Sequence, residues 1–177
     1  MFRKDIKKKG NIETSVSVTG DLILDGNIFG NATAGGDLVI RGNVERNAKS
    51  KGEASITGNV GGNICSGEDL KLQGSVSGDA TVRGDAVING SVGGRLTVSG
   101  DLRASGKFDG DISVKGDAVI GNDKEYAELG DSITVCGDLL IYAHIKGNLT
   151  VKGNLELHGT VGGKISCLGE ITYTEGK

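Results

Sequence analysis

The sequence contains no proline and no tryptophan, and only 3% of its residues are aromatic. The absence of proline suits a structure in which most backbone amides donate to a neighbouring strand. The scarcity of aromatics predicts a narrow, aliphatic core. No apolar run approaches the ~18 residues of a membrane-spanning helix, and no segment has the composition of a signal peptide. We therefore expect a protein that is made and kept in the cytoplasm.

Cysteine is also scarce, and the basic residues are unevenly distributed. Cys65, Cys136 and Cys167 are too few for a disulfide framework, and we expect them to be small apolar side chains in a reducing compartment. The first nine residues hold five basic residues and one acidic residue, whereas the other 168 carry a net charge of −7. The body of the chain therefore lacks both the basic stripe and the stacking aromatics that a nucleic-acid partner needs.

What the chain has in abundance is glycine, with 32 residues at regular intervals. The sequence repeats itself every 16 residues, with repeats that start at residues 4, 20, 36, 52, 68, 84, 100, 116, 137, 153 and 169. The repeat at 116 carries five extra residues, and the last repeat covers only nine. Strict self-similarity at a short period indicates an architecture in which one unit buries its apolar face only by stacking on the next.

The 16 positions of the repeat have distinct characters. Positions 3 and 5, and again 13 and 15, are mostly Leu, Ile, Val and Ala, which is the period-2 signature of strands with one buried face. Position 9 is a third aliphatic position. Glycine at position 7, as in Gly26 and Gly42, permits positive φ at a corner, and Asn27 and Asn43, which follow, also tolerate left-handed geometry.

These patterns predict an all-β fold, a single-stranded parallel β-solenoid of about ten full coils with three short strands per coil. Coils stacked ~4.8 Å apart would make a rod roughly 50 Å long. We expect one domain over residues 4–177, with a basic segment at 1–9 that partly joins the first coil and a small insertion near 121–128. So narrow a coil has no room for a ligand cavity, and we expect no enzymatic activity, no cofactor and no small-molecule substrate.

Repeats such as Gly84-Asp85-Ala86-Val87-Ile88-Asn89-Gly90-Ser91-Val92-Gly93-Gly94 resemble those of the bactofilins, which are bacterial polymer-forming cytoskeletal proteins. The resemblance covers about residues 4–175. It implies a right-handed β-helix, end-to-end polymerisation without nucleotide, a place at the inner face of the cell membrane, and a scaffold role for envelope-synthesis or cell-shape proteins. The opening Met1-Phe2-Arg3-Lys4 is similar to the membrane-targeting segment of many bactofilins.

The two ends of the rod are the first candidate site, because a terminal coil exposes unpaired main-chain groups and a slice of the apolar core. We expect a homopolymer, joined through residues of the first and last coils: Ile6, Ile12, Val16, Val18, Ile165, Cys167, Ile171 and Tyr173. Simple capping of both ends is the alternative. Lys8 stands at an inward position of the first coil, where it forms a charged cap or moves aside.

Two further surfaces are candidates. Position 4 faces solvent, yet it holds apolar side chains that favour lateral contact, with ordinary β-propensity as the alternative; these are Ile23, Val39, Val87, Val119 and Leu140. The basic N-terminal segment is a candidate contact with an anionic membrane surface, or alternatively a solubilising tail; its residues are Met1, Phe2, Arg3, Lys4, Lys7, Lys8 and Lys9.

The remaining polar features favour structural roles. Position 2 is acidic from Asp21 to Asp138, and we expect each carboxylate to accept hydrogen bonds at a corner rather than to bind calcium. His144 and His158 lie near one corner without a placed nucleophile, so we expect exposed histidines rather than a catalytic pair. The insertion at 122–131 is the one loop that offers a docking point for a partner.

Other solenoid classes fit less well. A hexapeptide acyltransferase needs a coil length divisible by six. An ice-binding protein is a more serious alternative, since threonine recurs at position 14, but charged residues at positions 12 and 16 interrupt the flat surface that ice requires. A trimeric phage-type spike is the other non-polymerising alternative, although it needs equivalent halves in each repeat.

Overall fold

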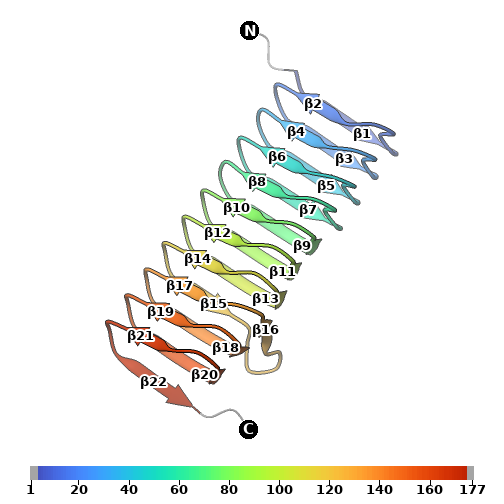
Figure 1. The fold of residues 1–177 in the computed structure, drawn as a ribbon. Coiled ribbons are helices and arrows are strands. Elements are labelled where there is room, and N and C mark those ends of the chain that lie inside the picture. Colours follow the sequence, from blue (N-terminus) through green and yellow to red (C-terminus); the bar gives the residue numbers. More distant parts are fainter. Residues whose placement is uncertain (1–3, 175–177) are drawn as a thin grey trace.

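The computed structural model describes residues 4–174, which form strands, turns and connections and contain no helix. The strands stack into a rod with about 16 residues per coil, and the two termini lie at opposite ends of it (Figure 1). All strand pairs are parallel, because each coil repeats the path of the one before. The all-β solenoid expected from the repeat is therefore confirmed.

Two long sheets form the walls of the rod. The twelve-stranded sheet consists of β1 (Ile6–Lys9), β3 (Leu22–Asp25), β5 (Leu38–Arg41), β7 (Ala54–Thr57), β9 (Leu70–Val76), β11 (Ala86–Val92), β13 (Leu102–Phe108), β15 (Ala118–Ile120), β16 (Ala127–Leu129), β18 (Leu139–Ile145), β20 (Leu155–Val161) and β22 (Ile171–Thr174). The ten-stranded sheet consists of β2 (Val16–Val18), β4 (Ala32–Ala34), β6 (Ala48–Ser50), β8 (Ile64–Ser66), β10 (Ala80–Val82), β12 (Leu96–Val98), β14 (Ile112–Val114), β17 (Ile133–Val135), β19 (Leu149–Val151) and β21 (Ile165–Cys167).

The third face of each coil differs from the separate strand that the sequence predicted. In the first coils, position 9 contributes isolated bridges, such as Ile28 with Val44. In β9, β11, β13, β18 and β20 the strand simply continues from position 3 to position 9. The difference arises because the third face has only one inward residue per coil, at position 9. The backbone on this face is therefore too short for a separate strand.

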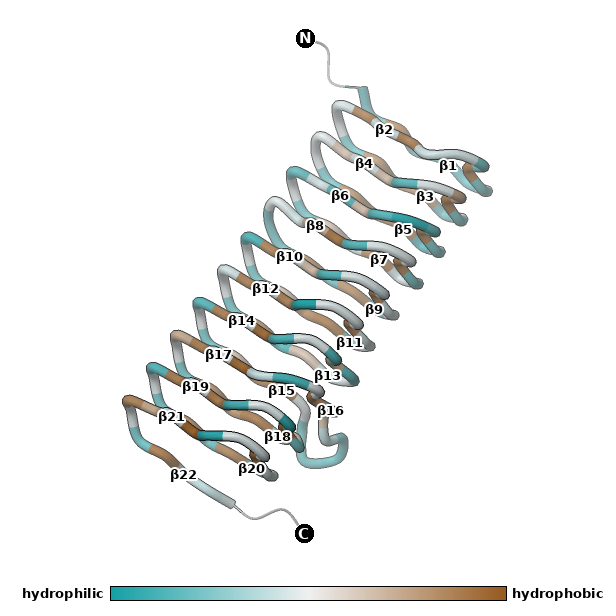
Figure 2. Tube along the Cα trace, in the orientation of Figure 1, coloured by the Kyte–Doolittle hydropathy of each residue, from teal (hydrophilic) through white to brown (hydrophobic). Residues whose placement is uncertain are grey.

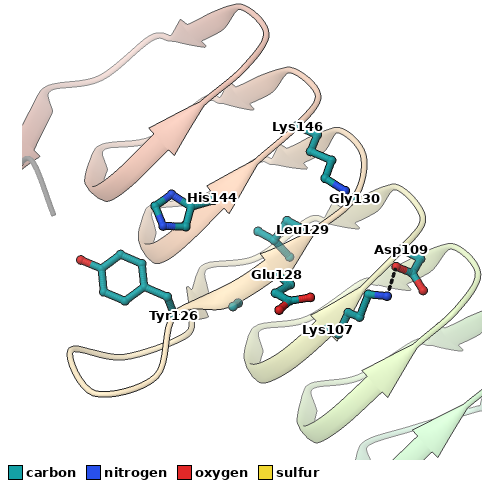
Figure 3. Close-up of a pocket in the computed structure, with 9 residues that line it drawn as sticks. Lys107, Asp109, Tyr126, Glu128, Leu129, Gly130, His144 and Lys146 are labelled. Carbon is teal, nitrogen blue, oxygen red and sulfur yellow. Dashed lines mark ion pairs between the residues drawn. The ribbon is translucent and has the colours of Figure 1, made fainter. Parts of the chain in front are cut away.

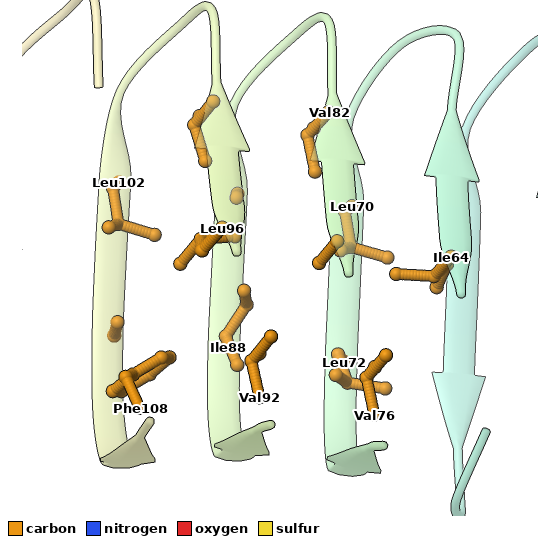
Figure 4. Close-up of a cluster of buried hydrophobic side chains, with 14 of the residues drawn as sticks. Ile64, Leu70, Leu72, Val76, Val82, Ile88, Val92, Leu96, Leu102 and Phe108 are labelled. Carbon is orange, nitrogen blue, oxygen red and sulfur yellow. The ribbon is translucent and has the colours of Figure 1, made fainter. Parts of the chain in front are cut away.

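The core runs the whole length of the rod and is one side chain deep. Inward positions 3, 5, 9, 13 and 15 alternate with exposed ones along each strand, as the alternating hydropathy in Figure 2 shows. Like side chains stack on like, so that Leu72 lies beside Ile88 and Val76 beside Val92 (Figure 4). Among the described aromatic residues, Phe108 is the buried one, and it occupies position 9 between Val92 and Leu129.

Glycine at position 7 turns the corner between the first and third faces. These glycines have positive φ, for example +139° at Gly74, and a Cβ at Gly74 would run into the carbonyl oxygen of Gly58 one coil earlier. The expected left-handed geometry of Asn27 and Asn43 is wrong, because no described residue other than glycine has positive φ. Those asparagines have a different role, described below.

The insertion leaves the register intact. Ile120 pairs with Ile141 before it, and Ala127 pairs with Ala143 after it. The extra residues therefore loop out from the rod between β15 and β16, beside β18 (Figure 1). The coil on either side continues as if the loop were absent.

Candidate functional site: the ends and outer faces of the rod

Side-chain ladders hold the corners together. At position 2, Oδ1 of each aspartate accepts a hydrogen bond from the backbone nitrogen of the residue one coil later, as Asp69 does from Asp85 at 2.8 Å. Asparagines form an equivalent ladder at position 8, where Asn27 accepts from Asn43 at 2.8 Å. A third ladder, at position 12, includes Asn47, which accepts from Asn63 at 2.8 Å. The expectation that the position 2 aspartates accept corner hydrogen bonds is confirmed.

The asparagine ladders at positions 8 and 12 are a structural feature that the sequence analysis missed. A signal existed, since Asn31, Asn47 and Asn63 recur at one position of consecutive repeats. Corner amides have no carbonyl directly opposite them, and a short side-chain carbonyl supplies the missing acceptor. These residues therefore build the rod rather than bind a ligand.

The C-terminal end of the rod exposes core. Ile171 is 53% exposed and Tyr173 is 51% exposed, although both stand at positions that are buried in earlier coils. Ile165 is also exposed and Cys167 is partly so. The outer edges of β21 and β22 pair with no other described strand. This end therefore combines open backbone edges with an apolar surface.

The N-terminal end is less open and more polar. Ile6, Ile12 and Val16 are partly buried, and Val18 is buried. Lys8 is exposed, and its Nζ donates to the carbonyl oxygen of Asn11 at 2.8 Å. The Lys8 side chain is thus turned toward its own coil. Its aliphatic part occupies the inward position, and its ammonium group is hydrogen-bonded.

The apolar residues of position 4 lie on the outer side of the twelve-stranded sheet, as expected from the alternation. Ile23 and Val87 are exposed, and Val39, Val119 and Leu140 are half-buried. They do not form one unbroken stripe, because Ser55, Lys71 and Arg103 stand at the same position in the coils between. The outer face is therefore mixed, with apolar side chains separated by polar ones.

The basic N-terminal segment is described in part. Met1, Phe2 and Arg3 lie outside the described residues. Lys4, Lys7 and Lys9 are exposed, with Lys7 and Lys9 pointing outward from β1. Their charges are therefore displayed at one end of the rod.

The insertion creates a shallow cavity of about 320 Å³ on the rod. Its walls include Lys107, Asp109, Glu128, His144 and Lys146 (Figure 3). The charges partly cancel, because Nζ of Lys107 lies 3.1 Å from Oδ1 of Asp109.

Four rings cluster beside this cavity. Tyr126, from the insertion, stacks on His144 with centroids 5.6 Å apart, and Tyr142 stacks on His158 at 4.2 Å. Nε2 of His158 lies 2.8 Å from Oε1 of Glu156, and Nδ1 of His144 lies 2.9 Å from Oγ1 of Thr160. The histidines are therefore held by aromatic and polar neighbours, the Thr160 hydroxyl among them. His144 is exposed as expected, whereas His158 is half-buried, because Tyr142 stacks on its ring.

The described residues contain no group of three or more His, Cys, Asp or Glu side chains able to hold a metal ion. Cys65, Cys136 and Cys167 are all free thiols and half-buried. Within residues 4–174, no helix is long and apolar enough to cross a membrane.

Comparison with known proteins gives no relative. No protein-family model, no curated protein and no solved structure matches the chain.

Proposed function

We propose that the protein is a structural scaffold whose rods join end to end, through their terminal coils, into a filament that needs no nucleotide. The observation that carries the proposal is the open C-terminal coil, where Ile171 and Tyr173 expose a slice of core beside unpaired strand edges. Exposed edges of this kind template pairing with another chain. The resemblance of the repeats to bactofilins supports the same reading.

A join between copies has a clear physical driving force. Burial of apolar surface stabilises the joint by about 25 cal/mol per Å², and new main-chain hydrogen bonds satisfy the edges of β21 and β22. On the opposite end, β1 and β2 offer edges of the same two sheets. The repeat that stacks coils within one chain thus supplies a surface on which further coils can stack.

The test is negative-stain electron microscopy and sedimentation of the purified protein without nucleotide. Wild-type protein should form filaments, and Ile171→Arg and Tyr173→Arg should each prevent them, because a buried unpaired charge is costly. Thr174→Arg is the matched control on the same strand, since Thr174 stands at an outward position. Filaments in both core variants would contradict the joint. A wild-type monomer would favour a non-polymerising solenoid such as an ice-binding protein, and a wild-type trimer would favour a spike-like protein.

We also propose that the filament lies on an anionic membrane, in the cytoplasm at the inner face of the cell membrane, and recruits envelope-synthesis proteins. Lys4, Lys7 and Lys9 are exposed at the first coil, and each basic residue near an anionic surface contributes about 1 kcal/mol. A filament repeats this weak contact at every subunit. Liposome co-sedimentation should fall when all three are changed to glutamine; truncation is unsuitable, because β1 belongs to the first coil. Equal binding would contradict membrane contact.

A further inference from the structure

A groove runs along the outer face of the twelve-stranded sheet. One stretch of about 330 Å³ is lined by Asp85, Asp101 and Asp117 on one side and by Val87, Arg103 and Val119 on the other. An adjoining stretch of about 320 Å³ begins at Glu53, includes Lys71 and shares Asp85 and Val87 with the first. The groove therefore spans several coils, with an acidic wall at position 2 and a wall at position 4 in which Val87 and Val119 alternate with the basic Lys71 and Arg103.

The acidic wall is rigid. Asp85, Asp101 and Asp117 each use Oδ1 to accept the backbone N–H of the next coil, at 2.8 to 2.9 Å. The second oxygen of each carboxylate has no hydrogen-bond donor in the part of the chain that the structure describes. The ladder thus holds a row of negative charges, about 4.8 Å apart, in a fixed orientation.

A basic ridge lies on the other side of the same glycine corner, at position 16. It consists of Lys51, Arg83, Lys115 and Lys152, which recur in alternate coils and are all exposed. Among the described residues, none of the four has a carboxylate within ion-pair distance. The ridge corrects the expectation that the body of the chain lacks a basic stripe, although the neighbouring carboxylates would repel a phosphate backbone.

The ridge and the groove have matching periods, because both arise from the same repeat. Cations every second coil, about 9.6 Å apart, can each meet a carboxylate in a row spaced at about 4.8 Å. The aliphatic stems of Lys and Arg can pack against Val87 and Val119 while their charged ends reach the acidic wall. Gly67 and Ser99 stand between the cations and leave notches in the ridge.

We infer that two copies of this chain pair side by side, the ridge of each lying in the groove of the other. Ridge and groove flank one corner, so a two-fold axis at that corner makes both contacts at once and closes the pair. The partner is a second copy because this chain carries the complement of its own groove. The inference gives a mechanism to the lateral contact expected from Val87 and Val119, and it does not depend on the end-to-end joint.

The experiment measures mass by analytical ultracentrifugation in a Tyr173→Arg background, so that axial joining does not contribute. The rods should form dimers that dissociate at high salt. Arg83→Glu with Lys115→Glu should weaken the dimer by at least roughly tenfold, since the pairs become repulsive on both copies. Asp85, Asp101 and Asp117 changed together to Asn should also weaken it, while Asn keeps the ladder acceptor, as Asn154 does naturally for Glu170.

The matched control is Lys49→Glu with Lys146→Glu, which makes the same change in charge away from the corner and should leave the dimer intact.

Monomeric rods at every concentration, or a dimer that survives both the ridge and the groove variants, would overturn the inference without affecting the filament proposal. Loss of pairing in the ridge variant alone would overturn the groove as its partner. Binding of monomeric rods to phosphatidylserine vesicles that depends on Arg83 and Lys115 would assign the ridge to a membrane instead.

Discussion

The Oδ1 atom of Asp85 accepts a hydrogen bond from the backbone nitrogen of Asp101 at 2.8 Å, one coil further along the chain. The same relationship joins Asp101 to Asp117 and Asp117 to Asp138, at 2.9 and 2.8 Å. Each bond connects successive coils at a corner, where the parallel ladder of the sheet is interrupted. The aspartates therefore stabilise the rod through these hydrogen bonds. Their negative charge lies on the outer surface.

Asp85→Ala should lower the free energy of unfolding by about 1 kcal/mol, because it removes the acceptor of the Asp101 amide. Asp85→Asn should change it little, since the amide oxygen can take the same bond. Urea denaturation in the Tyr173→Arg background measures both. Asp109→Ala, which removes an exposed carboxylate paired with Lys107 outside the ladders, is the control and should have a small effect. Equal losses in the Ala and Asn variants of Asp85 would show that charge rather than the hydrogen bond matters.

Gly74→Ala should be strongly destabilising, by about 3 kcal/mol or more, because it combines an unfavourable φ with a collision. The φ of Gly74 is +139°, and the added methyl group would meet the carbonyl oxygen of Gly58. Gly10→Ala separates the two effects: φ is +88° there, but nothing lies within 4 Å of the added carbon. Thermal melts should therefore show a smaller loss for Gly10→Ala, of about 1 kcal/mol. Similar losses at both sites would mean that the collision relaxes freely.

Substitutions of the large buried side chain of Phe108 test how well the core tolerates a loss of volume. Phe108→Ala should cost about 4 kcal/mol, since it leaves a cavity between Val92 and Leu129, whereas Phe108→Leu should cost less because the neighbouring residues are aliphatic. Phe29, which is exposed, provides the control, and Phe29→Ala should change stability by less than about 0.5 kcal/mol. Chemical denaturation distinguishes the three. A small effect of Phe108→Ala would indicate that adjacent coils close the gap.

The repeat made much of this fold predictable, because one buried face and one corner glycine per turn leave a chain few other ways to pack. Leu72 and Ile88 at position 5 and Gly74 and Gly90 at position 7 already define where the wall and the corner lie. The role of Asn43 was not predictable from its local preference, because its partner, the amide of Asn59, lies a whole coil away.

The charged residues at position 16 were visible in the sequence, but their place beside the acidic groove was not. Lys51 and Arg83 are 32 residues apart and fall on one line of the rod only when the coils are stacked. Tyr126 lies in the insertion, whose path no repeat position dictates, so its stacking on His144 could be seen only in three dimensions. The repeat specifies the rod. The surface features of the rod, such as the charged ridge and the ring cluster, depend on residues at which the repeats differ.

Excision of residues 122–126 should leave a folded rod, because it restores a 16-residue coil between Ile120 and Ala127. Ile120 already pairs with Ile141, and Ala127 with Ala143, so that both sides of the loop are in register without it. The expected cost is about 1 kcal/mol, from loss of the edge-to-face contact of Tyr126 with Tyr142, whose ring centroids lie 6.0 Å apart, and of its stacking on His144. Circular dichroism, thermal melts and electron microscopy of the excised protein measure folding, stability and assembly separately. Tyr126→Ala is the matched control, and it should reproduce the loss in stability. Retained folding and filaments would leave the loop free for a partner, whereas global unfolding would show that the loop is needed to carry the chain around that corner.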